Sequence, residues 1–375
     1  MSAHDKKLRI LSLVPYKVFP AVMGGQKGIA LFYKYLSDLV NLRVITTKNN
    51  EAKEHYKVQN ILSNSKARYI NLLLFFTLKK SVKEHNITHL LFEHPYFAWL
   101  IFLCKKLLHT DIIVHSHNIE SERFKSIGKW WWRILWQYEK WAYSLANHVW
   151  FKTEEDLMYA VNHFKIEKEK CAVIPYGIEI DKLPSETDIV KSKKIIEEKY
   201  NIHADETIIL FNGTLSYKPN LDALISILED INPLLLTSNL KYKIIICGKN
   251  LPIELNELKE YKEKNLIYAG FVEDIDLYFK ACDIFLNPVQ DGGGIKTKLV
   301  EAIGFGKFAV SSVNGAIGVN RICTNGRLKI VEDNHWQAYA DAIIDFKKVE
   351  NNNQDFYQIF SWKNIAAKAF KELEK

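Results

Sequence analysis

The chain has 375 residues, more than one hydrophobic core usually supports, so its length predicts two domains. Its composition, 48% hydrophobic and 25% charged, is typical of a soluble globular protein, and its apolar runs fall short of the roughly 18 residues that span a membrane. The net charge is +7, but residues 1–180 carry 26 Lys and Arg against 16 Asp and Glu, which indicates an anionic partner for the first half.

Cysteine usage and the N-terminus both indicate a reducing compartment. The five cysteines are scattered, odd in number and contain no Cys-x-x-Cys pair, which argues against a disulfide framework and against a zinc site. The first residues, MSAHDKKLRILSLV, pass from a short basic stretch into a strand-like segment and show no signal-peptide cleavage pattern. We therefore expect a cytoplasmic protein.

Along the first half, strand-like apolar runs alternate with amphipathic helical stretches, as in a parallel α/β sheet. Helices are predicted between the strands, among them 24–39 and the tryptophan-rich segment 123–146. The predicted strands are 8–14, 42–47, 88–94, 111–117, 148–153 and 171–177.

A second series of strands begins near Thr207 and predicts a second doubly wound sheet. Its members are 207–213, 242–248, 266–272, 283–288, 308–312 and 328–332. The polar, lysine-rich segment between the two series suits a linker, and the end of the chain predicts a helix with Ser361 as its N-cap. We predict an N-terminal domain 1–180, a linker 181–205, a C-terminal domain 206–355 and a C-terminal helix 356–375.

The glycines of MGGQKG, residues 23–28, stand between the first strand and the next helix. Gly24 and Gly25 would let the backbone approach a phosphate or a sugar at the start of that helix. A plain strand-to-helix turn explains them equally well. The pattern is not G-x-G-x-x-G, so it does not favour a nicotinamide dinucleotide.

A second glycine-rich segment, DGGGIKTKLVEA at 291–302, also opens a helix, and it does not match a Walker A loop. The backbone amides of 294–296 and the helix dipole predict an anion site. Lys296 and Lys298 are unfavourable at this helix end unless an anion is bound, which favours a diphosphate. Glu301 can only accept hydrogen bonds when ionised and suits ribose hydroxyls; the alternative is a solvated glutamate on a helix face.

Two histidines in VHSHNIESE are candidates for contact with a reacting group. His115 and His117 stand two apart at a strand end, so both can point to one face, where a histidine can donate a proton or a hydrogen bond. Structural hydrogen bonding is the alternative for each. The sequence shows no third ligand at a defined spacing, so we expect no metal site. The Asp-x-Asp of EDID, 273–276, is interpreted as the start of a helix rather than a metal–diphosphate motif.

The segment KWWWRILWQYEKWAY, 129–143, mixes five tryptophans with lysine and arginine. A helix that packs these rings into the core is the first interpretation. An aromatic and basic surface at a membrane is the alternative, and it fits the excess of basic residues in the first half. No nucleic-acid recognition motif is present, so we expect no nucleic-acid partner.

Taken together, the motifs resemble those of the GT-B glycosyltransferases, most closely the retaining, family 4-like group (glycosyl transferases group 1). The segments that carry the resemblance are the GG loop, VIPYGIEID, ILFNGTLSYKPNLDAL, IIICGKN, LIYAGFVEDIDLYFKACDIFLNP and GGGIKTKLVEAIGFGK. The resemblance covers nearly the whole chain. It implies an α/β protein of the GT-B fold, with two Rossmann-like parallel-sheet domains facing a central cleft and a C-terminal helix that crosses back to the first domain.

The resemblance also implies that the second domain binds a nucleotide-sugar donor. Glu301 would hold the ribose hydroxyls, and the turn of Gly293, Gly294 and Ile295 with Lys296 would meet the diphosphate and the sugar. The backbone near Phe271 and Val272 would read the base. The remaining donor-binding positions implied are Gly213, Thr214, Lys218, Gly248 and Thr297.

In the first domain, the resemblance implies acceptor binding. His117 would contact the transferred sugar near its reacting carbon, and Gly24 and Gly25 would approach the donor phosphates. With His117, the residues Lys296 and Glu301 complete the set that we expect to carry the reaction.

Two departures from the family pattern concern the donor. A glutamate that often stands eight residues before Glu301 is replaced by Gly293, so the identity of the sugar does not carry over. Thr214 replaces the arginine of the diphosphate-binding stretch, and Lys218 lies one place before the expected lysine, where Pro219 stands. Lys296 is therefore the better candidate for neutralising the leaving diphosphate.

The predicted function is a metal-independent glycosyltransferase (EC class 2.4) that uses a nucleotide-diphosphate sugar and needs no further cofactor. The acceptor would be a glycan or a lipid-linked glycan in cell-surface polysaccharide or glycoconjugate synthesis, with peripheral contact of the basic, Trp-rich domain with the inner face of an anionic membrane. The alternatives are a non-catalytic nucleotide-sugar-binding scaffold and another enzyme of the same fold, such as an inverting transferase or an epimerase.

Overall fold

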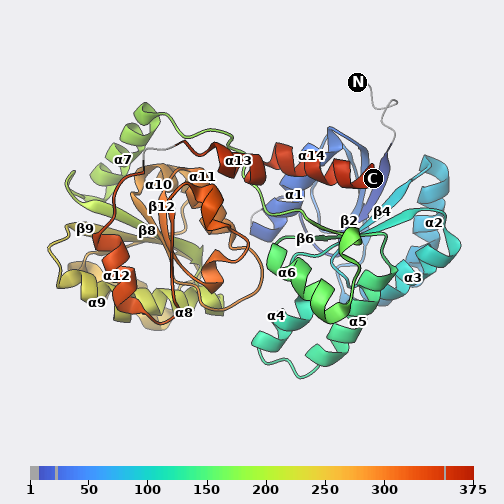
Figure 1. The fold of residues 1–375 in the computed structure, drawn as a ribbon, viewed down its shortest axis with the longest axis horizontal. Coiled ribbons are helices and arrows are strands. Elements are labelled where there is room, and N and C mark those ends of the chain that lie inside the picture. The colour runs from blue at the N-terminus through green and yellow to red at the C-terminus, as the bar shows by residue number, and fades with distance from the viewer. Residues whose placement is uncertain (1–7, 22–23, 350–351) are drawn as a thin grey trace. The chain divides into compact units, whose positions relative to one another are not determined.

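The computed structural model describes residues 8–21, 24–349 and 352–375 of the chain (Figure 1). Its internal contacts divide it into two compact units. Among the described residues, unit 1 comprises those up to Gly177 together with Trp362–Lys375, and unit 2 comprises those from Ile178 to Ser361.

Unit 1 is built on a seven-stranded sheet in the order β3-β2-β1-β4-β5-β6-β7, in which every pair is parallel. The order reverses between β1 and β4, and in such sheets ligands bind at the carboxyl ends of the strands beside this point. The strands are β1 (Arg9–Leu13), β2 (Asn41–Thr47), β3 (Lys57–Leu62), β4 (His89–Glu93), β5 (Asp111–His115), β6 (His148–Phe151) and β7 (Cys171–Val173).

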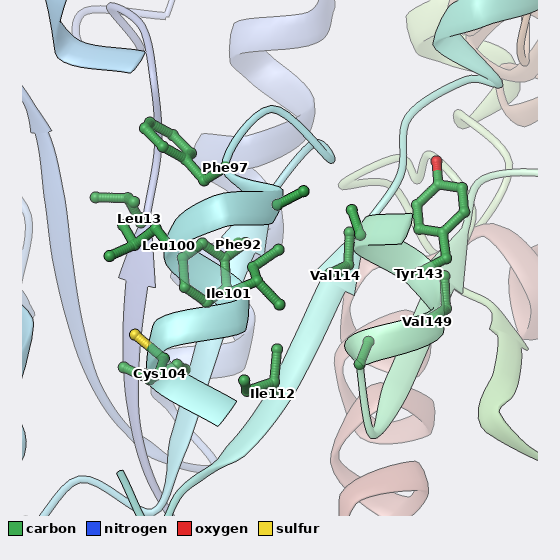
Figure 2. Close-up of a cluster of buried hydrophobic side chains, with 14 of the residues drawn as sticks. Leu13, Phe92, Phe97, Leu100, Ile101, Cys104, Ile112, Val114, Tyr143 and Val149 are labelled. Atoms are coloured by element: carbon green, nitrogen blue, oxygen red, sulfur yellow. The ribbon is translucent and has the colours of Figure 1, made fainter. Parts of the chain in front are cut away.

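Helices cover the sheet of unit 1 and bury its apolar strands on both faces, as the continuous apolar runs require. Figure 2 shows one such cluster, in which Phe92 of β4 and Val114 of β5 lie among buried residues of the neighbouring helices. The helices are α1 (Gly24–Ser37), α2 (Leu73–His85), α3 (Ala98–Leu107), α4 (Glu120–Ser126), α5 (Trp132–Leu145), α6 (Glu154–Tyr159) and α14 (Trp362–Leu373), with a short 3-10 helix η1 (Lys66–Ile70).

Unit 2 repeats the architecture with six parallel strands in the order β10-β9-β8-β11-β12-β13, which reverses between β8 and β11. The strands are β8 (Thr207–Thr214), β9 (Tyr242–Lys249), β10 (Leu266–Gly270), β11 (Ile284–Asn287), β12 (Phe308–Ser312) and β13 (Leu328–Val331). The helices are α7 (Glu186–Tyr200), α8 (Lys218–Ser226), α9 (Asn232–Leu236), α10 (Ile275–Ala281), α11 (Thr297–Gly304), α12 (Trp336–Ile344) and α13 (Gln354–Phe360), with a 3-10 segment η5 (Ile253–Lys264).

Two sequence predictions of local structure were confirmed. The last helix, α14, contacts α1 of unit 1, where the Trp362 ring lies 6.5 Å from that of Phe32 and 5.3 Å from that of Tyr176. The EDID segment starts α10, because the Asp274 side chain accepts a hydrogen bond from the amide of Leu277 at 3.2 Å.

One prediction was wrong, and one strand was missed. The tryptophan-rich segment 123–146 is not one helix: α4 ends at Ser126 and α5 begins at Trp132, and between them Gly128 has a φ of +72°, which ends a helix. The sequence reading also omitted β3, whose mixed sequence KVQNIL lacks a continuous apolar run because it forms an edge strand with exposed positions.

Within the described residues, the five cysteines form no disulfide, and no helix is both long and apolar enough to cross a bilayer.

Candidate functional site

The polar centre of unit 1 lies at the carboxyl ends of β4 and β5. In the parallel register of these strands, Glu93 stands opposite His115, so the last residue of each strand meets the other. His117 follows two residues later and returns to the same carboxylate. A carboxylate and two imidazoles therefore converge beside the switch point, where a ligand is expected.

Glu93 is fully buried and accepts three hydrogen bonds. Its Oε1 atom accepts from the Tyr33 hydroxyl at 2.6 Å and from Nδ1 of His115 at 3.1 Å, and its Oε2 atom accepts from Nε2 of His117 at 2.6 Å. The Tyr33 hydroxyl is in turn hydrogen-bonded to Ser12 at the end of β1. A buried carboxylate needs such donors to remain ionised.

The pKa directions agree with an ionised Glu93 between neutral histidines. Burial alone would raise the pKa of Glu93, but the charges that His115 and His117 carry when protonated, and the hydrogen bonds that they donate, bring it well below its ordinary value. Burial lowers the pKa of His115 to about 4 and that of His117 well below its ordinary value. Since His117 donates Nε2–H to Glu93, its Nδ1 carries a lone pair at neutral pH and can accept a hydrogen bond from a substrate hydroxyl.

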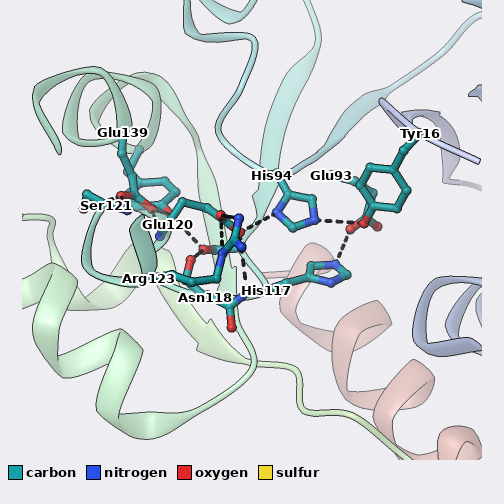
Figure 3. A network of polar contacts seen from close by, with 11 residues as sticks. Tyr16, Glu93, His94, His117, Asn118, Glu120, Ser121, Arg123 and Glu139 are labelled. Carbon is teal, nitrogen blue, oxygen red and sulfur yellow. Dashed lines mark hydrogen bonds and ion pairs between the residues drawn. The ribbon is translucent and has the colours of Figure 1, made fainter. Parts of the chain in front are cut away.

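His94 links this centre to a second carboxylate, as Figure 3 shows. It directly follows β4 with a φ of +67°, a conformation that is uncommon for residues other than glycine and is often found at functional sites. Its Nε2 atom lies 2.8 Å from the Tyr16 hydroxyl, and its Nδ1 atom lies 3.2 Å from Oε1 of Glu120. The His94 and His117 rings lie 4.4 Å apart.

Glu120 and Glu139 fix the segment that follows His117. Arg123 donates to Oε2 of Glu120 from Nη2 at 2.6 Å and from Nε at 2.9 Å. Although burial opposes ionisation, His94 and Arg123 bring the pKa of Glu120 below its usual range. Glu139 on α5 accepts from the amides of Glu120 and Ser121 at 2.9 and 3.0 Å, and so anchors the start of α4 to α5.

The fold supplies the third potential metal ligand that the spacing of the sequence did not show. One ligand atom each from Glu93, His115 and His117 lies within 4.8 Å of the others. The argument from sequence against a third ligand is therefore wrong. The contacts of 2.6 and 3.1 Å are hydrogen-bond lengths, however. The buried Lys152 also places an ammonium group near the trio, because its charge lowers the pKa of His115 and of His117. The expectation that no metal takes part stays a prediction.

The GG segment lies at the start of α1 in unit 1. The helix begins at Gly24, and a Cβ atom at Gly25 would meet no other atom within 4 Å, so packing does not require glycine at Gly25. Met23 of the same motif lies outside the described residues.

In unit 2 the glycine-rich loop precedes α11, as the sequence predicts. Gly292 and Gly294 have φ values of +89° and +71°, which only glycine adopts readily, while Gly293 is exposed. Ile295 follows, and α11 begins at Thr297 with Lys296 as its N-cap residue. The loop therefore depends on its first and third glycines for its path.

The lysines of this loop have partners that the sequence did not reveal. The Nζ atom of Lys296 donates to the carbonyl oxygens of Gly292 and Gly294 at 2.9 and 3.1 Å, so it closes the loop on itself. Lys298 lies 3.8 Å from Oε2 of Glu301. The Glu301 side chain is only 17% exposed, so the alternative of a freely solvated glutamate does not describe it.

The ends of β8 and β9 bring the other donor-binding candidates of unit 2 close together. A Cβ atom at Gly248 would lie 2.2 Å from the carbonyl oxygen of Gly213, so the close approach of these strands requires glycine there. Asn220 donates to the carbonyl oxygen of Thr214 at 3.1 Å. The exposed Lys218 pairs with Asp222 on its own helix.

The two candidates for reading the base follow β10. Phe271 is 67% exposed and Val272 is partly exposed, directly after Gly270, whose φ is +66°. An exposed aromatic residue at the end of a parallel strand is available to a ligand.

Family models match both halves of the chain. The model described as "Glycosyltransferase Family 4" matches residues 22–182, and the model described as "Glycosyl transferases group 1" matches residues 206–348. The chain belongs to glycosyltransferase family 4. Its two parallel-sheet units and the contact of α14 with α1 are those of the GT-B fold.

Individual relatives are distant. An uncharacterised 44.6 kDa protein of the cps region of Klebsiella pneumoniae is 26% identical over 72% of this chain and 63% of its own length, so the match spans less than two thirds of that relative. The alpha-monoglucosyldiacylglycerol synthase of Streptococcus pneumoniae is 28% identical over 34% of this chain and 29% of its own. HepE from Anabaena, solved in complex with UDP, has a TM-score of 0.73 at 17% identity and covers 98% of this chain and all of its own.

The sequence reading missed the partners of His117. Glu93 stands within the apolar run HLLFE, and an acidic residue in a buried strand is a signal of a polar site, because it must find donors there. Glu139 gives a similar signal, since it is a carboxylate on a helix rich in aromatic residues, and it is buried there. No such signal marks Tyr16, His94 and Arg123, since only the fold brings them together.

Proposed function

We propose that this chain transfers a sugar from a nucleotide-diphosphate sugar to a glycan or a lipid-linked glycan acceptor. The observation that carries the proposal is the loop before α11: two glycines at positive φ lead into a helix whose first turn and a half presents Lys298 and the partly buried Glu301. Such a helix start binds a diphosphate, and a carboxylate beyond it accepts hydrogen bonds from ribose hydroxyls.

Unit 2 would hold the nucleotide. Glu301 would bind the ribose, the backbone at Phe271 and Val272 would read the base, and Gly213 and Gly248 would let the chain approach the diphosphate closely. Lys296 would have to exchange its two loop carbonyls for the phosphate oxygens, which makes its contribution smaller than that of an unengaged lysine. UDP in the structure of HepE supports a uridine nucleotide as the first donor to test.

Unit 1 would supply the contact with the transferred sugar. His117 is held by Glu93 with its Nδ1 lone pair unprotonated, so it would accept a hydrogen bond from a sugar hydroxyl rather than act as a charged group. Gly24 and Gly25 would contribute backbone amides at the start of α1.

In the reaction, the bond between the anomeric carbon and the phosphate oxygen breaks, and a bond between the anomeric carbon and the acceptor oxygen forms. We propose retention of configuration: the acceptor attacks from the face that the leaving group occupies, and the leaving phosphate takes the acceptor's proton. The nucleoside diphosphate leaves with its charge balanced by the helix-start amides and by Lys296, without a metal.

Two relatives suggest the biosynthetic role of the enzyme and the kind of acceptor that it uses. The Klebsiella relative is encoded in a cps region, which supports a role in surface polysaccharide synthesis, and the streptococcal relative is named for a glucosyldiacylglycerol product, which supports a lipid-linked acceptor. We propose a cytoplasmic enzyme that works at the inner face of a membrane.

A thermal-shift panel of UDP, GDP, ADP and their sugars tests the donor. A nucleotide at about 100 times its Kd stabilises the protein by roughly 2.7 kcal/mol, and Glu301→Ala, which should weaken binding at least about tenfold, should reduce this stabilisation to about 1.4 kcal/mol or less. Nucleotide binding without transfer to any lipid or glycan acceptor would favour the scaffold alternative. Conversion of the donor in the absence of acceptor, followed by NMR, would favour an epimerase.

A further inference from the structure

An apolar groove of about 450 Å³ lies on unit 1 between η1, α3 and α5. Tyr69 and Ile70 of η1 form one wall, and Trp131, Ile134 and Tyr138 form the other. The indole N–H of Trp99 is already hydrogen-bonded within the protein, because its Nε1 donates to the carbonyl oxygen of Tyr69 at 2.7 Å. The groove therefore presents ring faces and aliphatic carbons rather than hydrogen-bonding groups.

The rim of the groove exposes large apolar side chains to solvent. Ile70 is 76% exposed and Ile134 is 65% exposed, although both line the same groove. Other large apolar side chains near each wall in the sequence are exposed as well: Leu72, Leu73 and Phe76 near one wall, and Ile127 and Trp130 near the other. Large apolar side chains gathered at a surface in this way mark a site that something covers.

The two segments that contribute most of the groove's lining are rich in basic residues. Residues 63–83 contain five Lys and Arg, and residues 123–138 contain four, with no Asp or Glu in either segment. Three of the nine have acidic partners just outside the segments, at Glu84, Glu120 and Glu122. Exposed aromatic and aliphatic side chains among lysines and arginines are the pattern of a surface that lies in the interface of an anionic membrane.

The inner end of the groove reaches the polar centre of unit 1. Tyr96 lines the groove, and its ring stacks on that of His94 at 5.1 Å with an interplanar angle of 7°. The His94 ring lies 4.4 Å from that of His117. A chain in the groove would therefore place its polar end beside the histidines.

We infer that this face of unit 1 docks on an anionic membrane, and that the groove holds the hydrocarbon chain of the lipid that carries the acceptor. The apolar walls match the chain, the basic rim matches the phosphates of lipid head groups, and Tyr96 marks the end at which the acceptor sugar would lie. The identification of the lipid as the acceptor rests on the proposed function, whereas membrane docking does not.

Vesicle co-sedimentation of the full chain tests the docking surface. The chain should bind phosphatidylcholine vesicles that contain phosphatidylglycerol and lose most of this binding without phosphatidylglycerol or at high salt. Ile70→Ser with Ile134→Ser should lower the partition coefficient at least about tenfold, because two exposed apolar anchors are lost. The matched control is Ile253→Ser with Ile322→Ser in unit 2, where the residues are 92% and 84% exposed, and it should bind like the wild type.

The contribution of the basic residues to membrane binding is tested by its own matched pair of variants. Lys129→Glu with Arg133→Glu should weaken binding to phosphatidylglycerol vesicles roughly tenfold, whereas Lys347→Glu with Lys348→Glu, which are also exposed, should not. Vesicles with brominated hydrocarbon chains test the groove directly. They should quench tryptophan fluorescence of the wild type, and Trp131→Phe should lose a large part of the quenching.

Several results would overturn the inference. The wild type would fail to sediment with phosphatidylglycerol vesicles, or the Ile70/Ile134 variant would bind as well as the Ile253/Ile322 variant. A dimer in light scattering that the Ile70/Ile134 variant disrupts would identify a second copy as the occupant instead. Nucleotide-induced thermal stabilisation, measured on the same proteins, separates the two claims: stabilisation without vesicle binding refutes only the docking surface, and vesicle binding without stabilisation refutes the proposed function.

Discussion

Glu93→Gln is the sharpest test of the polar centre in unit 1. The carboxylate accepts one hydrogen bond from Tyr33, one from His115 and one from His117, and it is fully buried. Glutamine replaces one oxygen with an NH₂ group, which faces a donor and forces a neighbouring imidazole to change its tautomer. A hydrogen bond to a charged group contributes about 1.5–3 kcal/mol, and the mismatched donor adds a penalty, so we expect a loss of about 2–4 kcal/mol in the free energy of unfolding.

Urea unfolding followed by tryptophan fluorescence measures this loss of stability in unit 1, the unit that contains Glu93. Trp336 is the one tryptophan of unit 2, and the other eight of the nine belong to unit 1, so the signal reports chiefly on unit 1. Glu84→Gln is the matched control, because Glu84 forms only an exposed pair with Lys80 at 3.7 Å and should cost less than about 0.5 kcal/mol. Equal stability of the two variants would refute the account of Glu93.

Three further predictions concern pH, packing and metal. Burial lowers the pKa of His115 to about 4, so the unfolded chain binds a proton below pH 6.5 that the folded chain does not, and stability falls by about 2 kcal/mol from this group as the pH drops to 5. His115→Gln should flatten that slope in urea titrations, and an unchanged slope would refute the assignment. Gly248→Ala should destabilise unit 2 by more than about 2 kcal/mol, since its Cβ would lie 2.2 Å from a carbonyl oxygen, whereas Gly25→Ala should be tolerated; calorimetry compares them. Dialysis against a chelator should leave transferase activity unchanged, and restoration of a lost activity by a divalent cation would contradict the metal-independent mechanism.

The sequence predicted the fold well because the signals for strands and for the loops between them lie in short, continuous segments. Buried parallel strands such as Asp111–His115 are continuous apolar runs, and glycines mark the loops that leave them. The tryptophan-rich helix was predicted wrongly because Gly128 lies in a segment whose neighbours all favour helix, and the exposure of Trp130, 82%, depends on where that break falls.

The site was predicted less completely, because its contacts are between segments far apart in the chain. His117 was identified, but Tyr33 and Glu93, which lie 60 residues apart and fix its surroundings, were not. Lys296 was interpreted as a partner for the diphosphate alone, whereas the folded loop directs its ammonium group to two carbonyl oxygens. Such partners depend on strand register and loop closure, which the sequence does not show by spacing alone.

The most direct test of the central claim is the transfer of a labelled sugar from a panel of nucleotide sugars to a lipid or glycan extract. The account predicts acceptor-dependent transfer from at least one donor with release of nucleoside diphosphate. Glu301→Ala should reduce this transfer by at least about tenfold, the loss of one charge-assisted hydrogen bond. Full transfer by Glu301→Ala, or no transfer from any donor that binds, would contradict it.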